Sequence, residues 1–263
     1  MENFASEIQT ARLGETHLFF TGQAGYIIKS SSGQLLAIDL YLSECVERIE
    51  KSMGFKRLSP KILGPFDLEF DYVIATHPHM DHFDMDSIPE IMSHKRTRLF
   101  CSVGCEKLVD KLDMPDEETG SRITYVRQGD NIKAGDFEIH FVPCDHGSGA
   151  PDAVGVVVRV DGKTIYETGD TCLRLDWIDE IKEFGKIDIM IAPINGAFGN
   201  LDEMECAWLS HALKPGLTIP CHYGMFASHG GNPGKFFDIM KSSFPENKIF
   251  IMCAGEKLTL SYE

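Results

Sequence analysis

The chain has 263 residues, a hydrophobic fraction of 43% and a formal net charge of −15. This composition is ordinary for a globular protein with a sizeable core, and the length fits one large mixed α/β domain or two small ones. The negative charge and the lack of any Lys- or Arg-rich run argue against binding of long nucleic acids, which requires clustered cations. Bound divalent ions would still concentrate positive charge in one cleft, so an acidic chain can have a cationic active site.

No segment has the pattern of a membrane span or an export signal. The longest apolar runs, such as Ile187–Ile194, are strand-sized and too short to cross a bilayer. The start, Met1–Phe4, lacks the basic and apolar regions of a signal peptide. None of the eight cysteines forms a C-x-x-C pair, which favours small buried residues kept reduced. We expect a cytoplasmic protein that does not interact with membranes.

The first third of the chain is dominated by short strand-like runs separated by turns that contain Gly and Ser. An irregular, partly helical segment from Leu42 to Phe70 separates the last of these runs from the others. The predicted strands are His17–Phe20, Gly25–Lys29, Gln34–Asp39 and Asp71–Thr76.

The remaining two thirds mix strands with helices. The middle of the chain predicts helices at Ser87–Ser93 and before Leu112, and strands at Arg98–Ser102, Arg122–Val126, Phe137–Pro143, Val154–Val160 and Thr164–Thr168. The last third predicts helices at Asp176–Phe184, Asp202–Leu213 and Pro233–Ser242, and strands at Ile187–Ile191, Leu217–Cys221 and Lys248–Ile251. Strands followed by alternating helices and strands, twice over, predict an α+β fold with two packed sheets and helices outside, as one domain spanning residues 1–263.

The segment with the clearest chemistry follows the predicted strand that ends at Thr76. Its sequence places His77, His79, Asp81 and His82 within six residues. In extended backbone, residues two apart point the same way, so the two first histidines can bind one ion together. Asp81 and His82 lie where the chain turns and can face a second ion. Imidazole and carboxylate ligands suit zinc, iron or manganese, and such a mixed set is what a dinuclear hydrolytic centre requires.

Four ligands cannot complete two ions, so others must come from elsewhere. His146, Asp170 and His222 each lie at or just beyond the end of an apolar run, where a sheet can present them at one rim. Each signal is weak alone: a His at a strand end is often an ordinary surface or core residue, and Asp170 in Gly-Asp-Thr could be a turn or helix-cap residue. The close spacing of four potential ligands in the first motif argues against a chance occurrence. The pattern therefore favours metal binding.

These residues, in this order, resemble the complete motif set of the metallo-β-lactamase superfamily, and the resemblance covers nearly the whole chain. It implies an αββα sandwich of two mixed sheets with a metal centre at one edge. In the superfamily pattern, one ion would be held by His77, His79 and His146. The other would be held by Asp81, His82 and His222, with Asp170 bridging both.

A narrower resemblance is to the L-ascorbate-6-phosphate lactonase branch. It involves Thr76–Asp84, Gly169–Thr171, Pro193–Gly196 with the turn at Gly199-Asn200, and Ile219–Tyr223. Members of that branch are cytoplasmic, open a sugar-derived lactone and are associated with manganese and with oligomers. The resemblance therefore implies a homo-oligomeric lactonase that holds two divalent ions, manganese or zinc with iron as a further option. Its substrate would be a small sugar-acid metabolite, and a phosphorylated one would be anionic.

If the site is real, a metal-bound hydroxide would attack the lactone or ester carbonyl, while a metal stabilises the developing oxyanion. The departing ring oxygen then needs a proton. Asp81 is the candidate catalytic residue, because one carboxylate oxygen can hold metal or water while the other transfers a proton. The alternative for Asp81 is a ligand role alone.

Four further residues are candidates for substrate binding. Asn195 lies at a strand end, Tyr223 and His229 flank a Gly-rich loop, and Arg174 follows Gly-Asp-Thr, where it could meet an anionic substrate. Each also has a structural interpretation: a turn residue for Asn195, a solvent-facing loop residue for His229 and an exposed helix-start residue for Arg174.

Four alternative functions compete with the lactonase or esterase. A phosphodiesterase acting on a small cyclic nucleotide is the nearest, because the same metal chemistry serves phosphorus and carbon. A di-iron redox protein is disfavoured because His79 stands where such proteins typically carry an acid, and a β-lactamase is disfavoured by the lack of an export signal. A non-catalytic metabolite-binding protein would not need to keep seven ligands.

Overall fold

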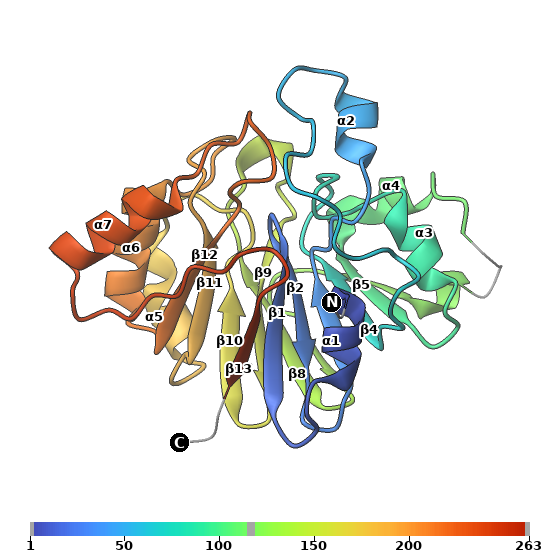
Figure 1. Cartoon of the computed structure of the whole chain (residues 1–263), viewed down its shortest axis with the longest axis horizontal. Coiled ribbons are helices and arrows are strands. Elements are labelled where there is room, and N and C mark those ends of the chain that lie inside the picture. Colours follow the sequence, from blue (N-terminus) through green and yellow to red (C-terminus); the bar gives the residue numbers. More distant parts are fainter. Residues whose placement is uncertain (1–2, 115–118, 261–263) are drawn as a thin grey trace.

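Two β-sheets lie face to face, and helices cover both outer faces (Figure 1). The structure is a computed structural model that describes residues 3–114 and 119–260. Within these residues one sheet has seven strands and the other has six. The predicted α+β sandwich of two mixed sheets flanked by helices is confirmed.

The first sheet combines antiparallel and parallel pairs. Strands β13, β1, β2 and β3 pair antiparallel, whereas β3, β4, β5 and β6 pair parallel. In spatial order the strands are β13 (Lys257–Leu260), β1 (Thr16–Gly22), β2 (Gly25–Lys29), β3 (Leu35–Ile38), β4 (Tyr72–Ala75), β5 (Arg98–Ser102) and β6 (Ile123–Val126).

The second sheet is also mixed. Strands β10, β11 and β12 run parallel, and β7, β8, β9 and β10 pair antiparallel. In spatial order the strands are β12 (Leu217–Cys221), β11 (Ile189–Pro193), β10 (Lys163–Glu167), β9 (Val154–Val160), β8 (Phe137–Pro143) and β7 (Asn131–Ala134).

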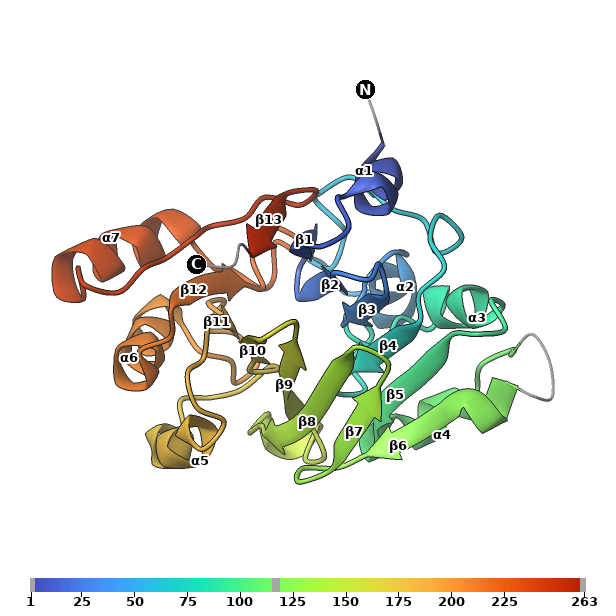
Figure 2. The same ribbon diagram turned by 90° about the horizontal axis from the view of Figure 1, so that it is seen from below.

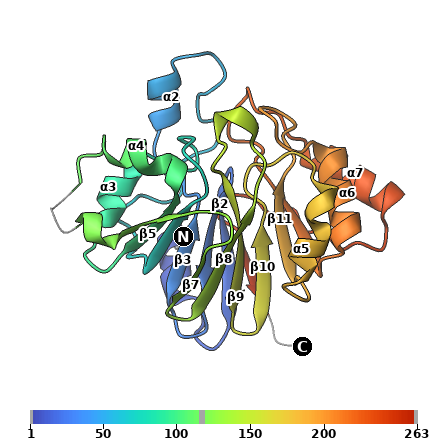
Figure 3. The same ribbon diagram turned by 180° about the vertical axis from the view of Figure 1, so that it is seen from behind.

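The helices divide between the two outer faces, as the view from below shows (Figure 2). Beside the first sheet lie α1 (Phe4–Thr10), α3 (Ser87–Met92) and α4 (Glu106–Val109). Beside the second sheet lie α5 (Ile178–Lys182), α6 (Glu203–Leu213) and α7 (Pro233–Ser243). The short helix α2 (Cys45–Glu50) belongs to neither layer and stands above the sheets in the views from front and behind (Figures 1 and 3).

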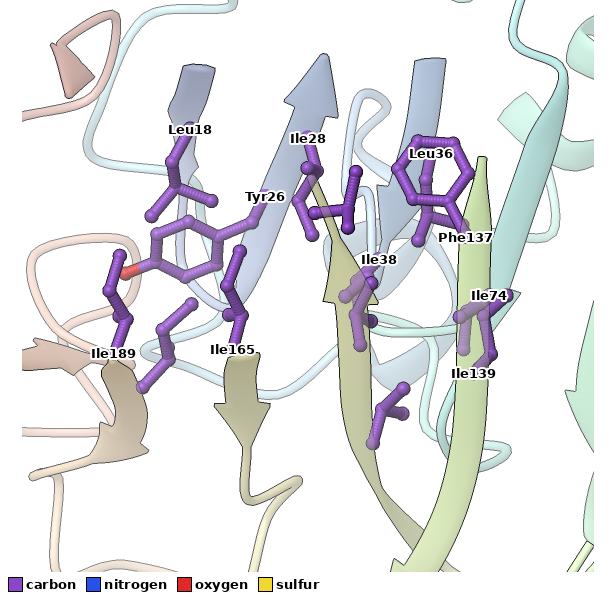
Figure 4. Packing of buried hydrophobic residues seen from close by; sticks show 14 of the residues in the cluster. Leu18, Tyr26, Ile28, Leu36, Ile38, Ile74, Phe137, Ile139, Ile165 and Ile189 are labelled. Atoms are coloured by element: carbon purple, nitrogen blue, oxygen red, sulfur yellow. The ribbon is translucent and has the colours of Figure 1, made fainter. Parts of the chain in front are cut away.

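The main core fills the space between the sheets. Branched and aromatic side chains from alternate strand positions meet there, because successive residues of a strand point to opposite faces. Figure 4 shows Leu18 and Tyr26 of the first sheet facing Ile165 and Ile189 of the second. A second apolar set on the outer face of each sheet packs against the helices, so the strands are buried on both sides.

Most predicted elements are confirmed, with ends that differ by one or two residues, but the strand expected at Lys248–Ile251 is wrong. That segment makes only an isolated parallel bridge between Ile249 and Thr218 of β12. The Thr218 N–H donates to the Lys248 carbonyl, and the Phe250 N–H donates to the Thr218 carbonyl. The next donor on β12 would be residue 220, which is a proline without an N–H, so the ladder ends there.

Three elements were not expected from the sequence: α1, β7 and β13. Helix α1 is only seven residues long; the Asn3 side chain caps its start by accepting from the Ser6 N–H, and the rest of its support is tertiary. The buried Lys29 ammonium donates to the carbonyls of Ile8, Gln9 and Ala11 at 2.8–2.9 Å, which satisfies the end of the helix. Strands β7 and β13 are short and pair at sheet edges, where local patterning is weak.

None of the helices in residues 3–114 and 119–260 is both long enough and apolar enough to cross a membrane.

Candidate metal centre

Seven predicted ligand residues come from four strand ends at one rim of the sandwich. The His77–His82 segment follows β4, His146 follows β8, Asp170 follows β10 and His222 follows β12. Strands β10 and β12 run parallel with β11 between them, and β8 runs in the same direction because it is two antiparallel steps from β10. The carboxyl ends of all three strands therefore lie at the same edge, where open α/β sheets usually form their sites.

The first cluster consists of three histidines, with one carboxylate oxygen at its edge. His79 Nδ1 lies 3.0 Å from His77 Nε2 and 3.0 Å from His146 Nε2. Asp170 Oδ2 lies 3.9 Å from His146 Nε2. His77 is fully buried and His146 is nearly so. Ring nitrogens thus converge on one point.

The second cluster shares Asp170 with the first. Asp170 Oδ2 lies 3.1 Å from His222 Nε2 and 3.4 Å from His82 Nε2. The two ring nitrogens are 3.3 Å apart. Asp81 Oδ2 lies 3.4 Å from His222 Nε2 and 3.7 Å from His82 Nε2. One oxygen of Asp170 therefore lies between the two groups.

These donors fit divalent metal ions. Nitrogen or oxygen ligands at about 2.0–2.1 Å around a tetrahedral ion lie about 3.3 Å from one another, close to the separations within both clusters. A neutral imidazole has one N–H, so three converging histidines cannot all be satisfied by donating to each other. Among the described residues, four groups bring candidate ligand atoms within 4.8 Å of one another: His77, His79 and His146; Asp39, His77 and His82; Asp81, His222 and His229; and His82, Asp170 and His222.

The buried negative charge of the second cluster also favours binding of a cation. Burial raises the pKa of Asp170, but the neighbouring His222 and His82 outweigh this effect and hold the pKa well below its ordinary value. Burial lowers the pKa of His222, but Asp170 and Asp81 outweigh burial and raise the pKa to about 9. The buried carboxylates thus draw positive charge onto the imidazoles around them. Bound cations would supply that charge directly.

In the first cluster, by contrast, the pKa values of the histidines are lowered. Burial lowers the pKa of His146 to about 4, and burial also lowers the pKa of His77 and of His79. Neutral imidazoles are the form that binds a metal, so this cluster presents lone pairs at neutral pH. The other ring nitrogen of His146, Nδ1, is buried and finds no hydrogen-bond partner within the described part of the chain.

Asp39 supports the second cluster and was not singled out in the sequence. It follows β3, the parallel neighbour of β4, and is fully buried. Its Oδ2 lies 2.6 Å from His82 Nδ1 and accepts a 2.6 Å hydrogen bond from the Thr76 hydroxyl, while Oδ1 accepts from the Thr76 N–H. A carboxylate on the far ring nitrogen orients a ligand histidine and raises its basicity. The only local signal was an Asp at the end of an apolar strand.

Gln23 was also missed. It lies in the turn between β1 and β2, is fully buried and has a φ of +57°. Its side-chain NH₂ group donates to Asp81 Oδ2 at 2.8 Å and to His229 Nδ1 at 2.9 Å. Asp39 and His222 also have positive φ values, of +50° and +62°. Such conformations are costly for residues other than glycine, and they persist here in the groups that surround the clusters.

Of the four candidates for substrate binding, only His229 borders the pocket beside the clusters. The pocket has a volume of about 290 Å³, and its lining includes His79, Asp81, His146 and His222. Burial and the nearby His222 lower the pKa of His229 to about 4. Because Nδ1 accepts from Gln23, Nε2 carries the proton of the neutral ring.

The other three candidates lie outside the lining of this pocket. The Asn195 side-chain oxygen Oδ1 accepts from the Asn200 side-chain NH₂ group, which supports its interpretation as a turn residue. The Tyr223 hydroxyl donates to the Met252 carbonyl at 2.6 Å. The Arg174 guanidinium pairs with Asp145 and Asp176. For these residues the contacts describe structural roles.

Comparison with known proteins agrees with this geometry. Residues 49–223 match the family described as the beta-lactamase superfamily domain. A UPF0173 metal-dependent hydrolase from Anaeromyxobacter dehalogenans (strain 2CP-C) is 28% identical over 242 residues, which cover 88% of this chain and 83% of the relative. Another, from Pyrococcus abyssi, is 27% identical over 249 residues, covering 92% and 98%.

The fold is shared with solved structures. Igni18, a metallo hydrolase from the hyperthermophilic archaeon Ignicoccus hospitalis, superposes with a TM-score of 0.73 at 23% identity, covering 94% of this chain and 99% of that protein. The metallo-beta-lactamase fold protein YhfI from Bacillus subtilis superposes with a TM-score of 0.68 at 15% identity, covering 92% and 99%. At these identities the likeness concerns the fold alone.

Proposed function

The chain belongs to the β-lactamase superfamily and is a metal-dependent hydrolase of that fold, and from this premise we propose that it opens a lactone or ester of a small molecule. The observation that carries the proposal is the pair of clusters that Asp170 joins, 3.9 Å from His146 Nε2 and 3.1 Å from His222 Nε2, in the lining of a small pocket. Two such centres side by side suit hydrolysis at a polarised carbonyl.

We assign His77, His79 and His146 to one ion and Asp81, His82 and His222 to the other, with Asp170 between them. Manganese or zinc, with iron as a further option, suits this set of imidazole and carboxylate ligands. When bound, such ions supply Lewis acidity and lower the pKa of water. The chain supplies the positions of the ligands, through Asp39 behind His82 and Gln23 behind Asp81.

Asp81 is the proton carrier in this proposal. It borders the pocket, and its carboxylate is ionised because His82 and His222 outweigh the effect of burial and lower its pKa. Gln23 holds Oδ2, so the orientation of the carboxylate is fixed. An ionised carboxylate at this position can accept a proton from the attacking water and pass it to the leaving oxygen.

His229 is the substrate-facing donor. Its ring is neutral at physiological pH, and Gln23 selects the tautomer with the proton on Nε2. A neutral N–H can hold an ester or lactone oxygen without adding a charge to the site. The stacking of this ring on His222, with centroids 5.0 Å apart, keeps it beside the metal ligands.

The pocket favours a carboxylic ester or lactone over a phosphodiester. Its described lining contains no Lys or Arg that could neutralise a phosphate. A carbonyl substrate has one oxygen that gains charge during attack; ions held by these ligands would supply Lewis acidity there, and the His229 N–H can donate to that oxygen. The volume of about 290 Å³ lies at the small end of the range for ligand pockets and suits a small metabolite.

The test couples metal content with turnover. Protein purified without added metal would be analysed for bound ions and assayed on a panel of lactones, esters and cyclic phosphodiesters, before and after chelation. About two ions per chain, with lactone or ester turnover that chelation abolishes and manganese or zinc restores, would support the proposal. Better turnover of phosphodiesters would replace it, and no turnover after reconstitution would leave a metabolite-binding protein on this fold.

A further inference from the structure

One wall of the pocket is aromatic. Phe55 and Phe198 border the cavity together with His229. The centroid of the His229 ring lies 5.1 Å from that of Phe198 and 5.7 Å from that of Phe55, and the two phenyl centroids are 6.2 Å apart. Phe226 packs behind them, with its centroid 4.9 Å from that of His229. The rings contact one another and form a continuous apolar face.

Phe198 is held in an unusual way. Its side chain is 59% exposed, although it is one of the largest apolar residues of the chain. Its backbone has a φ of +57°, and the flanking Gly196 and Gly199 also have positive φ. A bulky residue in this conformation is a clear outlier, and nothing in the core requires its ring. An exposed phenyl group kept at a strained turn beside a metal centre points to contact with a ligand.

Phe55 is positioned by hydrogen bonds between two loops. The Ser228 N–H and hydroxyl both donate to the Gly54 carbonyl, at 3.1 and 3.0 Å. The Leu58 N–H donates to the Met225 carbonyl at 2.8 Å. These hydrogen bonds join the loop that follows α2 to the loop that contains His229. They therefore fix the position of Phe55 in the aromatic wall.

The rest of the lining lacks cationic side chains. Outside the His/Asp cluster and the aromatic wall, the pocket is bordered by Val46, Pro78, Met80 and the carboxylate of Glu50. An adjoining hollow of about 460 Å³, which shares His79, His146 and Phe198 with the pocket, also has no Lys or Arg in its described lining. The chain has 25 Lys and Arg residues and a net charge of −15.

Two arginines that lie close in sequence to lining residues, Arg57 after Phe55 and Arg174 after Asp170, have other partners. Arg57 donates to the carbonyls of Tyr41, Ser43 and Ser59. Arg174 pairs with Asp145 and Asp176 and lies over the Trp177 ring. A phosphate or carboxylate on the substrate would therefore meet Glu50 and an acidic surface, with no side-chain cation in the lining to offset its desolvation.

We propose that the substrate is an uncharged lactone or ester with a hydrocarbon substituent, which lies against Phe198 and Phe55 while its carbonyl faces the metal centre. The inference rests on the proposed function and adds the class of substrate. It makes Phe198 and Phe55 specificity-determining residues. A phosphorylated sugar acid, as the resemblance to the lactonase branch implies, would be a poor substrate.

The experiment compares matched lactones with the metal-loaded protein. One series carries uncharged alkyl groups of increasing length, and another carries a carboxylate or a phosphate on the same ring. We expect kcat/KM to rise with alkyl length by about threefold per methylene until the pocket is full, and to be at least about tenfold lower for the charged analogues. Equal or better turnover of the charged analogues would overturn the inference while leaving the proposed function intact.

Two variants locate the effect. Phe198→Asn removes the ring but tolerates the positive φ, and it should reduce kcat/KM for the longest alkyl lactone about tenfold with little change for the unsubstituted ring. Phe55→Leu should act in the same direction. Phe237→Ala, at an exposed phenylalanine on α7, is the matched control and should change neither value. An equal loss of kcat/KM for all substrates would show that Phe198 does not recognise the substituent.

Binding gives an answer that does not depend on turnover. Calorimetry with the corresponding lactams, one alkylated and one phosphorylated, repeats the comparison on a ring that resists hydrolysis. Tighter binding of the alkyl lactam supports the apolar pocket even if no lactone is hydrolysed, in which case only the proposed reaction fails. Tighter binding of the phosphorylated lactam overturns the inference.

Discussion

The two sheets supply the candidate metal centre in different ways. The first sheet contributes four of the seven predicted ligand residues from the single segment that follows β4, and Asp39, at the end of the parallel neighbour β3, supports His82 among them. The second sheet contributes His146, Asp170 and His222 one at a time, from three strands that lie far apart in sequence.

This difference teaches where the site is robust and where it depends on packing. The segment after β4 brings its ligands together through local backbone geometry and one buried carboxylate. The ligands of the second sheet meet only if the strands pair in the correct register and the two sheets dock face to face. The shared Asp170 is the point at which both contributions must agree.

The largest expected effect comes from removing that shared carboxylate. In Asp170→Asn, one oxygen between the clusters becomes an amide, so we expect loss of at least one bound ion per chain and a decrease in kcat/KM of at least about 100-fold. Metal analysis and steady-state kinetics measure both. Asp145→Asn, an acid that pairs with Arg174 outside the clusters, is the control. Full metal content in Asp170→Asn would contradict the bridging position.

A smaller effect tests the asymmetry in ligand support. His82 has Asp39 behind it, whereas the far ring nitrogen of His146 has no partner within the described residues. We therefore expect the ion held by His77, His79 and His146 to leave first in a chelator titration. Asp39→Asn should weaken the other ion by about 10- to 100-fold and narrow the gap between the two. Simultaneous loss of both ions from the unmodified protein would argue against this difference between the two clusters.

The covering layer of the first sheet can be tested separately from the site. Lys29→Met leaves three carbonyls at the end of α1 without their donor, so we expect the free energy of unfolding to fall by about 1–3 kcal/mol. Urea denaturation measures this change, and Lys95→Met at an exposed position is the matched control. Metal content should be unchanged in Lys29→Met, because α1 lies on the outer face.

The smallest effect concerns the link between the sheets. Asp161, in the turn between β9 and β10, accepts hydrogen bonds from the Thr16 hydroxyl and from the Ser31 N–H and hydroxyl. Burial raises the pKa of Asp161, but these hydrogen bonds outweigh it and lower the pKa below its ordinary value. The stabilisation is therefore complete above the ordinary pKa of about 4 and is lost as the pH falls through the lower folded-state value.

We expect Asp161→Asn to cost about 1 kcal/mol at pH 7 and less at pH 3, because only the ionised carboxylate is favoured by these donors. Asparagine tolerates the φ of +48° at this position, so the backbone should be unaffected. Urea denaturation at both pH values gives the comparison. An equal loss at pH 3 and pH 7 would show that the carboxylate charge does not contribute to the link.

The sequence by itself determined the class of the fold and the first half of the site. Hydrophobic runs of strand length, separated by turns, were sufficient for most of the strands, and four ligand types within six residues were sufficient for a metal-binding segment. These features are local, since the side-chain period of a strand and the spacing of His77 and His79 act over a few residues. Resemblance to the superfamily then implied His146, Asp170 and His222 as partners.

Only the tertiary structure decided which polar residues support the site and which candidates lie away from it. Gln23 and Asp39 stand in unremarkable contexts in the sequence and become buried partners of Asp81 and His82 because three strand ends meet at one rim. Arg174 bonds to Asp145, which lies 29 residues away in the sequence, as well as to the nearby Asp176. The failed strand near Ile249 has a similar cause, since its partner strand contains Pro220. Such pairings depend on contacts between residues distant in sequence, which the local pattern of the chain does not encode.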